Sequence, residues 1–295
     1  MESLNWILLV VASRWLFYIM VSVSIGGVFG LLLFRSYPPA HNLLVRYSCF
    51  GVLGALIAAL AYFLARVGEV VDEGFWGALD SDVFLMMLDT SVGEALLIRV
   101  TSLLVLGGAL LGYPSLLKKE GGGAAVCGLL AMVSVGALVL SMTFTGHSVE
   151  QSVIFRLWLC VHVFVAFVWM GSLFPLWWVA RNAPFNISFD ILDQFGRIAA
   201  IAVPLLLVGG AYMSYQLTGW KNLISTEYGL VLISKVVVVS AIMSLAALNK
   251  LLLVPRLLDS GSSAAIQRSI ALEAGVGLLL LLATGVLSTA MGPVH

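Results

Sequence analysis

Eight long apolar runs are the feature of this sequence that most restricts its fold. Crossing about 30 Å of hydrocarbon takes about 20 apolar residues in a helix that rises 1.5 Å per residue. The runs that reach this length cover about residues 6–34, 48–65, 92–112, 124–143, 154–180, 197–217, 228–252 and 269–290. Only 10% of the 295 residues are charged, whereas a soluble domain carries about a quarter. We therefore predict an all-α, polytopic membrane helix bundle of about eight transmembrane helices, the second being the shortest.

Loop charge predicts the orientation of the bundle, because cytoplasmic loops carry an excess of Lys and Arg. If the loop after the first run is inside, the inside loops hold Arg35, Arg46, Lys118, Lys119, Arg181, Arg197, Lys250, Arg256 and Arg268. The outside loops then hold only Arg66, Arg156 and Lys221. We expect both termini on the outside, which is periplasmic in a bacterium. The net charge of zero, with no basic stripe, indicates no nucleic-acid partner.

The segment 66–91 is the one sizeable loop between the predicted spans. Its acidic residues alternate with apolar and aromatic ones, and are Glu69, Asp72, Glu73, Asp80, Asp82 and Asp89. This pattern predicts a short amphipathic helix on the outer face. Two roles remain open: a solvated cap with an interfacial anchor, or an acidic surface that attracts cations or docks a periplasmic partner.

The two halves of the sequence resemble each other. The third and seventh runs each place a cation, Arg99 or Lys235, six residues after a glycine, and the fourth and eighth are followed by Gly-containing stretches with His147 and His295. Four helices per half is an even number, so such repeats have the same orientation in the membrane. We predict two tandem four-helix repeats, residues 1–145 with the acidic loop 66–91, and residues 146–295.

Ionisable residues within the spans are costly in a bilayer and indicate functional or interhelical roles. They are Arg14, Arg99, His162, Lys235 and Glu273. For Arg14, extension of the side chain to the interface and a functional role are equally open. The repeated position of Arg99 and Lys235 favours a shared structural or gating role. Glu273 is explained by extension to the interface or by pairing with Arg268 or Lys250.

Two histidines form the candidate metal site. His147 lies at the outer end of the fourth run, and His162 lies eight residues inside the fifth, about 12 Å deeper at 1.5 Å per residue. Trp158 and Trp169 fall within about 40° of His162 on the helix wheel. Imidazole binds copper, zinc and haem iron well, and the third ligand would be His295, Glu150 or Met142. Without a metal, His147 would cap its helix and His162 would make one interhelical hydrogen bond.

The second half then resembles a known family. Residues 162–173 (HVFVAFVWMGSL) are similar to the histidine-containing helix of the copper resistance protein D family of bacterial inner-membrane copper transport proteins. Gly146-His147 matches the Gly-His that ends the family's preceding helix. Further matches follow in the family's order at Phe195-Gly196-Arg197, Tyr228-Gly229, Lys235, Asn249-Lys250 and Pro255. Ser172 departs from the family pattern, which has a second glycine there.

This resemblance implies a multi-pass protein of the bacterial inner membrane that works with a periplasmic copper-binding protein in copper uptake or tolerance. The family's histidines fall on His147 and His162, and the resemblance names copper as the metal. We expect a copper transport protein that accepts the ion at its outer face. Two alternatives remain: a membrane haem protein with histidine axial ligands, and a non-transporting partner of a periplasmic copper chaperone. No hydrolytic constellation is present, so we do not expect an enzyme.

Overall fold

The computed structural model describes residues 2–116, 122–146, 149, 151–222, 227–260 and 262–290, and these are helical almost throughout. Within them, eight helices are long and apolar enough to cross a membrane, as predicted. The helices that form all or most of each span are α1 (Glu2–Leu33), α2 (His41–Val71), α4 (Ser91–Leu116), α5 (Gly123–Leu140), α6 (Val153–Asn182), α7 (Phe185–Asn222), α8 (Glu227–Leu248) and α10 (Ala264–Ala290). Two short helices, α3 (Ser81–Leu88) and α9 (Arg256–Ser260), lie between them.

The second span is longer than its sequence predicts. Helix α2 has 31 residues and ends where Asp72 adopts a left-handed conformation, with φ of 51°. The expectation that residues 48–65 form the shortest span was wrong, because hydropathy detects only the apolar middle of the helix. The polar residues that bound this middle are compatible with helix, so α2 extends beyond the hydrocarbon thickness.

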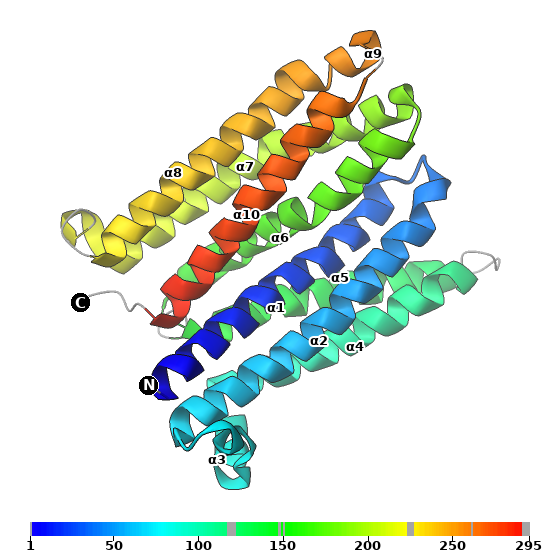
Figure 1. The fold of residues 1–295 in the computed structure, drawn as a ribbon. Helices are drawn as coiled ribbons and strands as arrows, with labels where there is room; N and C mark the ends of the chain where they lie inside the picture. The colour runs from blue at the N-terminus through cyan, green and yellow to red at the C-terminus, as the bar shows by residue number, and fades with distance from the viewer. Residues whose placement is uncertain are drawn as a thin grey trace.

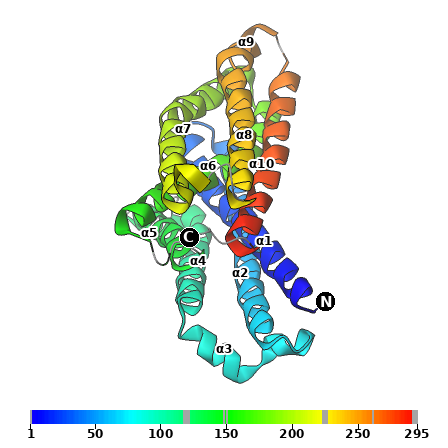
Figure 2. The same cartoon turned by 90° about the vertical axis from the view of Figure 1, so that its left-hand side faces the viewer.

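The eight long helices form two adjoining groups (Figure 1). Helices α1, α2, α4 and α5 lie on one side, and α6, α7, α8 and α10 lie on the other. Helix α1 joins the groups, since it packs against both α6 and α10. Helix α3, the first turn of α1 and the last turn of α10 lie at one end of the bundle, here the α3 end, and α9 lies at the opposite end, here the α9 end (Figure 2).

Glycines bring α1 and α6 into backbone contact. A Cβ added at Gly171 would lie 1.7 Å from the carbonyl oxygen of Ser22, and one added at Gly26 would lie 2.1 Å from the carbonyl carbon of Gly171. The hydroxyl of Tyr47 donates to the Gly171 carbonyl at 3.0 Å. Small residues allow this close approach between membrane helices, where dispersion and hydrogen bonds drive association. The contact fixes the two groups relative to each other.

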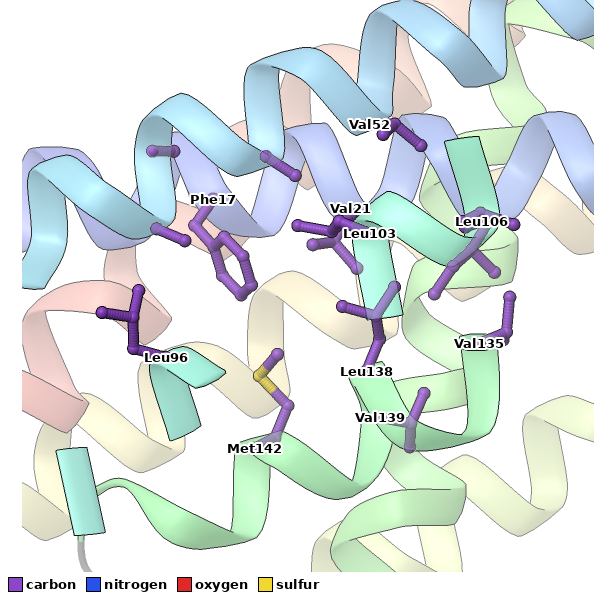
Figure 3. Packing of buried hydrophobic residues seen from close by; sticks show 14 of the residues in the cluster. Phe17, Val21, Val52, Leu96, Leu103, Leu106, Val135, Leu138, Val139 and Met142 are labelled. Carbon is purple, nitrogen blue, oxygen red and sulfur yellow. The ribbon is translucent and has the colours of Figure 1, made fainter. Parts of the chain in front are cut away.

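Each group has its own buried apolar cluster. In the first, side chains of α1, α2, α4 and α5 interdigitate, including Phe17, Leu103 and Leu138 (Figure 3). In the second, α6, α7 and α10 pack with the α1–α2 connection near the α9 end, around Phe34 and Leu176. Helix positions in both groups are therefore set by side-chain packing as well as by the close glycine contacts.

A short helix is present in the acidic segment 66–91, as predicted. Asp80 caps α3 by accepting hydrogen bonds from the backbone N–H groups of Asp82 and Val83, at 3.1 and 2.9 Å. Phe84 packs edge-on against Phe63 of α2, with ring centroids 5.2 Å apart. The aromatic side chains of Phe75 and Trp76, just before α3, are exposed. Contact of this segment with a membrane surface stays a prediction.

Candidate functional site

Arg14 of α1 is buried at the α3 end, with 6% of its surface exposed. Its Nη1 donates to the Ser288 carbonyl at 2.7 Å, the Ser288 hydroxyl at 3.1 Å and the Thr289 hydroxyl at 3.0 Å. Its Nη2 donates to the Tyr62 hydroxyl at 3.3 Å. The guanidinium therefore does not extend to the interface, but holds the end of α10 against α1 and α2.

Arg99 of α4 lies beside the same tyrosine. Its guanidinium carbon is 5.9 Å from the ring centroid of Tyr62 and 4.8 Å from that of Phe17, both cation–π distances. Its Nε donates to the Ser141 hydroxyl at 3.2 Å, and its Nη2 to the Thr145 hydroxyl at 3.2 Å. Among the ion pairs of the described residues, none involves Arg14 or Arg99. Hydroxyl, carbonyl and aromatic groups solvate these two buried charges.

Arg14 and Arg99 bring together the two chain segments that precede the predicted ligands His147 and His295. Gly146, with φ of 72°, follows the segment that Arg99 holds. A Cβ added at Gly146 would lie 3.8 Å from the Ser288 carbonyl oxygen and 4.0 Å from Nη2 of Arg14. The end of the fourth span and the end of α10 thus meet at Arg14.

His162 of α6 faces α7 and is partly buried. Its Nδ1 lies 3.1 Å from the carbonyl oxygen of Leu206. A carbonyl only accepts, so Nδ1 carries the proton of the neutral imidazole and Nε2 presents its lone pair. A histidine ligand usually donates its second ring N–H to such an acceptor, which fixes the ring and the tautomer. A Cβ on Gly210 would lie 3.4 Å from Cε1, so this glycine leaves room for the ring.

Trp158 and Trp169 also contact α7. The Trp158 ring would lie 3.0 Å from a Cβ at Gly209, and the Trp169 ring packs edge-on against Phe195 with centroids 6.1 Å apart. Lys235 of α8, half-buried, lies within Coulombic range of the His162 imidazole. The surroundings of Lys235 and Arg99 therefore differ, although their sequence contexts are alike.

The remaining candidate ligands are not gathered around His162 in the described structure. Met142 is buried in the apolar cluster of the first group, where Figure 3 shows its side chain directed toward Leu138 and Phe17. His147, Glu150 and His295 lie outside the described residues. Within the described ranges, no three His, Cys, Asp or Glu side chains form a group that could hold a metal ion.

A second polar cluster lies toward the α9 end. Glu273 of α10 is only 3% exposed and accepts a hydrogen bond from the side-chain amide of Asn249. Lys250 instead bonds to Asp193 at 3.5 Å, and Asp193 also pairs with Arg197 at 3.2 Å. The expectation that Glu273 extends to the interface or pairs with Arg268 or Lys250 was therefore wrong. The neutral partner Asn249 lies on a π-helical turn, Asn249–Leu253, which changes the direction of the side chains.

Sequence reasoning did not single out Tyr62 or Ser288, and named Asn249 only as part of the family match. Each is an uncharged polar residue in an apolar helix, which is a weak signal without its partner. A buried arginine, however, must find acceptors, and Ser288-Thr289 near the end of the last run would have been one place to look.

Comparisons with known proteins agree with the predicted family and with a membrane location. Residues 1–156 match the copper resistance protein D-like N-terminal domain, and residues 189–287 match copper resistance protein D. The chain is 23% identical over 254 residues to "Inner membrane protein YebZ" of Escherichia coli strain K12, which covers 83% of this chain and 84% of that protein. No solved structure matches the chain significantly. The chain is a membrane protein of the copper resistance protein D family.

Proposed function

We propose that this protein transports copper across the bacterial inner membrane and accepts the ion at its periplasmic face. In this proposal the α3 end is periplasmic, and copper is the transported substrate. His147 and His162 are its ligands, with His295, Glu150 or Met142 as the third. The family and the eight spans support a copper-related membrane role.

One observation carries the proposal, namely the meeting of Gly146 and Ser288 at Arg14. Gly146 directly precedes His147, and Thr289 precedes His295 by six residues. Two histidines far apart in sequence are thereby tethered to neighbouring points. This favours His295 over Met142 as the third ligand, because the thioether of Met142 is packed in an apolar cluster.

In this proposal, copper passes from the periplasmic face to His162, which lies deeper in the membrane. Its hydrogen bond to Leu206 leaves Nε2 as the ligating nitrogen. Lys235 is among the groups that act electrostatically on the His162 imidazole, so a protonated Lys235 repels a copper ion bound there. Such repulsion weakens binding, and a transport site must release its ion as well as capture it. We infer that Lys235 keeps the residence of copper at His162 short.

The acidic segment around α3 favours capture of a cation. Five of its carboxylates are exposed at the α3 end, and these belong to Asp72, Glu73, Asp80, Asp82 and Asp89. Negative charge beside a site raises the local concentration of cations and steers a basic partner. We infer that a periplasmic copper-binding protein delivers the ion to this surface.

Metal analysis of purified protein tests the proposal. Wild type and the His147→Ala/His162→Ala double variant are loaded with copper, passed over a desalting column and measured for bound copper. The double variant should lose most of the copper that the wild type retains. His41→Ala is the matched control, because His41 binds the Phe34 carbonyl at the α9 end and should not affect copper.

Cellular copper accumulation separates transport from binding. Cells that express the double variant should accumulate less copper than cells that express wild type or His41→Ala at equal membrane abundance. Equal bound copper in the wild type and the double variant would rule out copper binding by His147 and His162. Reduced binding with unchanged accumulation would instead indicate a non-transporting partner of a copper chaperone.

A further inference from the structure

A partly open cavity of about 400 Å³ lies between α6, α7, α8 and α10, nearer the α9 end. Its walls are mainly apolar, with Leu173, Phe195, Val203 and Met243 among the lining residues. Ligand pockets of about 300–1,000 Å³ with apolar walls and a few polar groups are typical of small-molecule sites. The cavity has the size and composition of such a site.

Two buried polar groups that make no hydrogen bond of normal geometry border this cavity. The indole N–H of Trp169 lies near the Glu273 carboxylate, but makes no hydrogen bond of normal geometry. The side-chain oxygen Oδ1 of Asn249 is also buried without a partner. Both residues are more than nine-tenths buried and line the cavity with Glu273. An unmade hydrogen bond in the protein interior is costly, so a ligand that completes these bonds is favoured.

Backbone features add to this polarity. Pro204 lines the cavity and has no N–H, so the carbonyl of Ala200, one turn earlier in α7, lacks its usual helical donor. The π-helical turn Asn249–Leu253 closes with a bond from Val254 N to Asn249 O of 2.8 Å. Single π-turns are frequent at functional sites, because they redirect side chains out of the regular helix pattern.

The charges around the cavity restrict the ligand. Lys250 lines the cavity and is paired with Asp193, as is the nearby Arg197. The described lining residues therefore offer no unpaired cation to an anionic ligand. The Glu273 carboxyl group disfavours phosphate or carboxylate heads. Trp169 offers a donor, whereas Asn249 and Glu273 offer acceptors. The complementary head is therefore uncharged, with either a hydroxyl that donates to Asn249 or Glu273 and accepts from Trp169, or a carbonyl that accepts from Trp169 alone.

We propose that this cavity binds a lipid-soluble quinone or quinol, with its ring between α7 and α8 and its polar groups at Trp169, Asn249 and Glu273. Helix α8 packs mainly on α10 and contacts α7 little. A ligand dissolved in the bilayer can therefore enter from the side, between these two helices. The site is separate from the histidines of the proposed copper path, and its occupancy is independent of copper.

Binding of decyl-ubiquinone, a short-tailed quinone, to purified full-length protein in detergent tests this proposal without copper. A saturable rise in the thermal unfolding midpoint is expected for wild type, because a ligand that binds only the folded state stabilises it. Trp169→Phe should weaken the affinity about three- to tenfold, the effect of one hydrogen bond. Ala246→Phe, which fills the cavity from α8, should abolish the response.

Trp177→Phe is the matched control, since Trp177 is on the same helix but stacks on Phe174 and does not line the cavity. It should bind decyl-ubiquinone as wild type does. The proposal is overturned by an absent or non-saturable response in wild type, or by equal affinities in wild type, Trp169→Phe and Ala246→Phe. Because no copper is present, either failure leaves the copper proposal untouched.

Discussion

The guanidinium of Arg14 donates to the carbonyl oxygen of Ser288 at 2.7 Å, across 274 positions of sequence. Ser288 is in the last turn of α10, where helical carbonyls lack intrahelical donors and the helix dipole is negative. The guanidinium of α1 thus supplies a hydrogen-bond donor to the last turn of α10. This contact joins the two helix groups at the α3 end. Gly146, which directly precedes the predicted copper ligand His147, lies beside it, and Thr289 precedes the predicted ligand His295 by six residues.

Arg14→Lys should destabilise the protein, because a lysine cannot reproduce the forked donation to Ser288, Thr289 and Tyr62. Loss of one or two charge-assisted hydrogen bonds predicts a change of about 2 kcal/mol in the free energy of unfolding. The thermal midpoint in detergent should fall by about 4–8 °C. Retained copper should fall as well, since the tether between the two histidine segments is loosened.

Arg197→Lys provides the control for this substitution. The Arg197 side chain is 69% exposed and pairs with Asp193 one turn away. Exposed ion pairs contribute about 0–1 kcal/mol, and lysine preserves the charge, so the midpoint should hardly change. Equal shifts in Arg14→Lys and Arg197→Lys would contradict the special role of the buried guanidinium.

Gly171→Ala should separate α1 from α6. The new Cβ would lie 1.7 Å from the Ser22 carbonyl oxygen, so backbone must move. We expect a loss of about 3 kcal/mol or more, the upper range for overpacked cores, seen as poor recovery of monodisperse protein. Gly128→Ala on α5 meets no atom within 4 Å and should be neutral or slightly stabilising, because alanine favours helix. Similar recovery of both variants would count against the close contact.

The sequence was sufficient to predict eight spans, because each leaves a long apolar run that little else explains. It was insufficient for their ends, as α2 demonstrates: polar residues interrupt the apolar run without ending the helix. The α3 helix was predictable because acidic and apolar residues alternate between two spans. Packing of α1 on α6 was not, since it depends on which glycines face each other.

The environments of the buried charged residues were also only partly predictable from the sequence. The sequence identified Arg14, Arg99 and Glu273 as unusual, but not their partners. Local charge spacing suggested Arg268 or Lys250 for Glu273, whereas tertiary packing and the π-helical turn supplied Asn249. The cavity was also beyond sequence reasoning, because it results from the limited contact between α7 and α8 rather than from any motif.

Cysteine labelling tests the predicted orientation. In a background without the three native cysteines, Asp82→Cys at α3 and Ala265→Cys at the start of α10 place exposed thiols at opposite ends of the bundle. The excess of Lys and Arg in the predicted inside loops, which include the α9 end, predicts that the α3 end is periplasmic. A membrane-impermeant maleimide should label Asp82→Cys in intact cells, and Ala265→Cys only after lysis. The reverse pattern would invert the orientation.

Substitution of Glu273 tests whether its hydrogen bond with Asn249 requires a charged carboxylate. Within the described structure, Lys250 is paired with Asp193 and no ion pair reaches Glu273. Glu273→Gln keeps an oxygen that accepts from Asn249 Nδ2 and removes a carboxyl group that is costly to ionise in the membrane interior. We expect Glu273→Gln to be neutral or stabilising in thermal unfolding. Glu273→Leu removes the acceptor and leaves both polar atoms of the Asn249 amide without partners, which should cost about 1–3 kcal/mol. A marked loss of stability in Glu273→Gln would show instead that the folded protein depends on the carboxyl group itself.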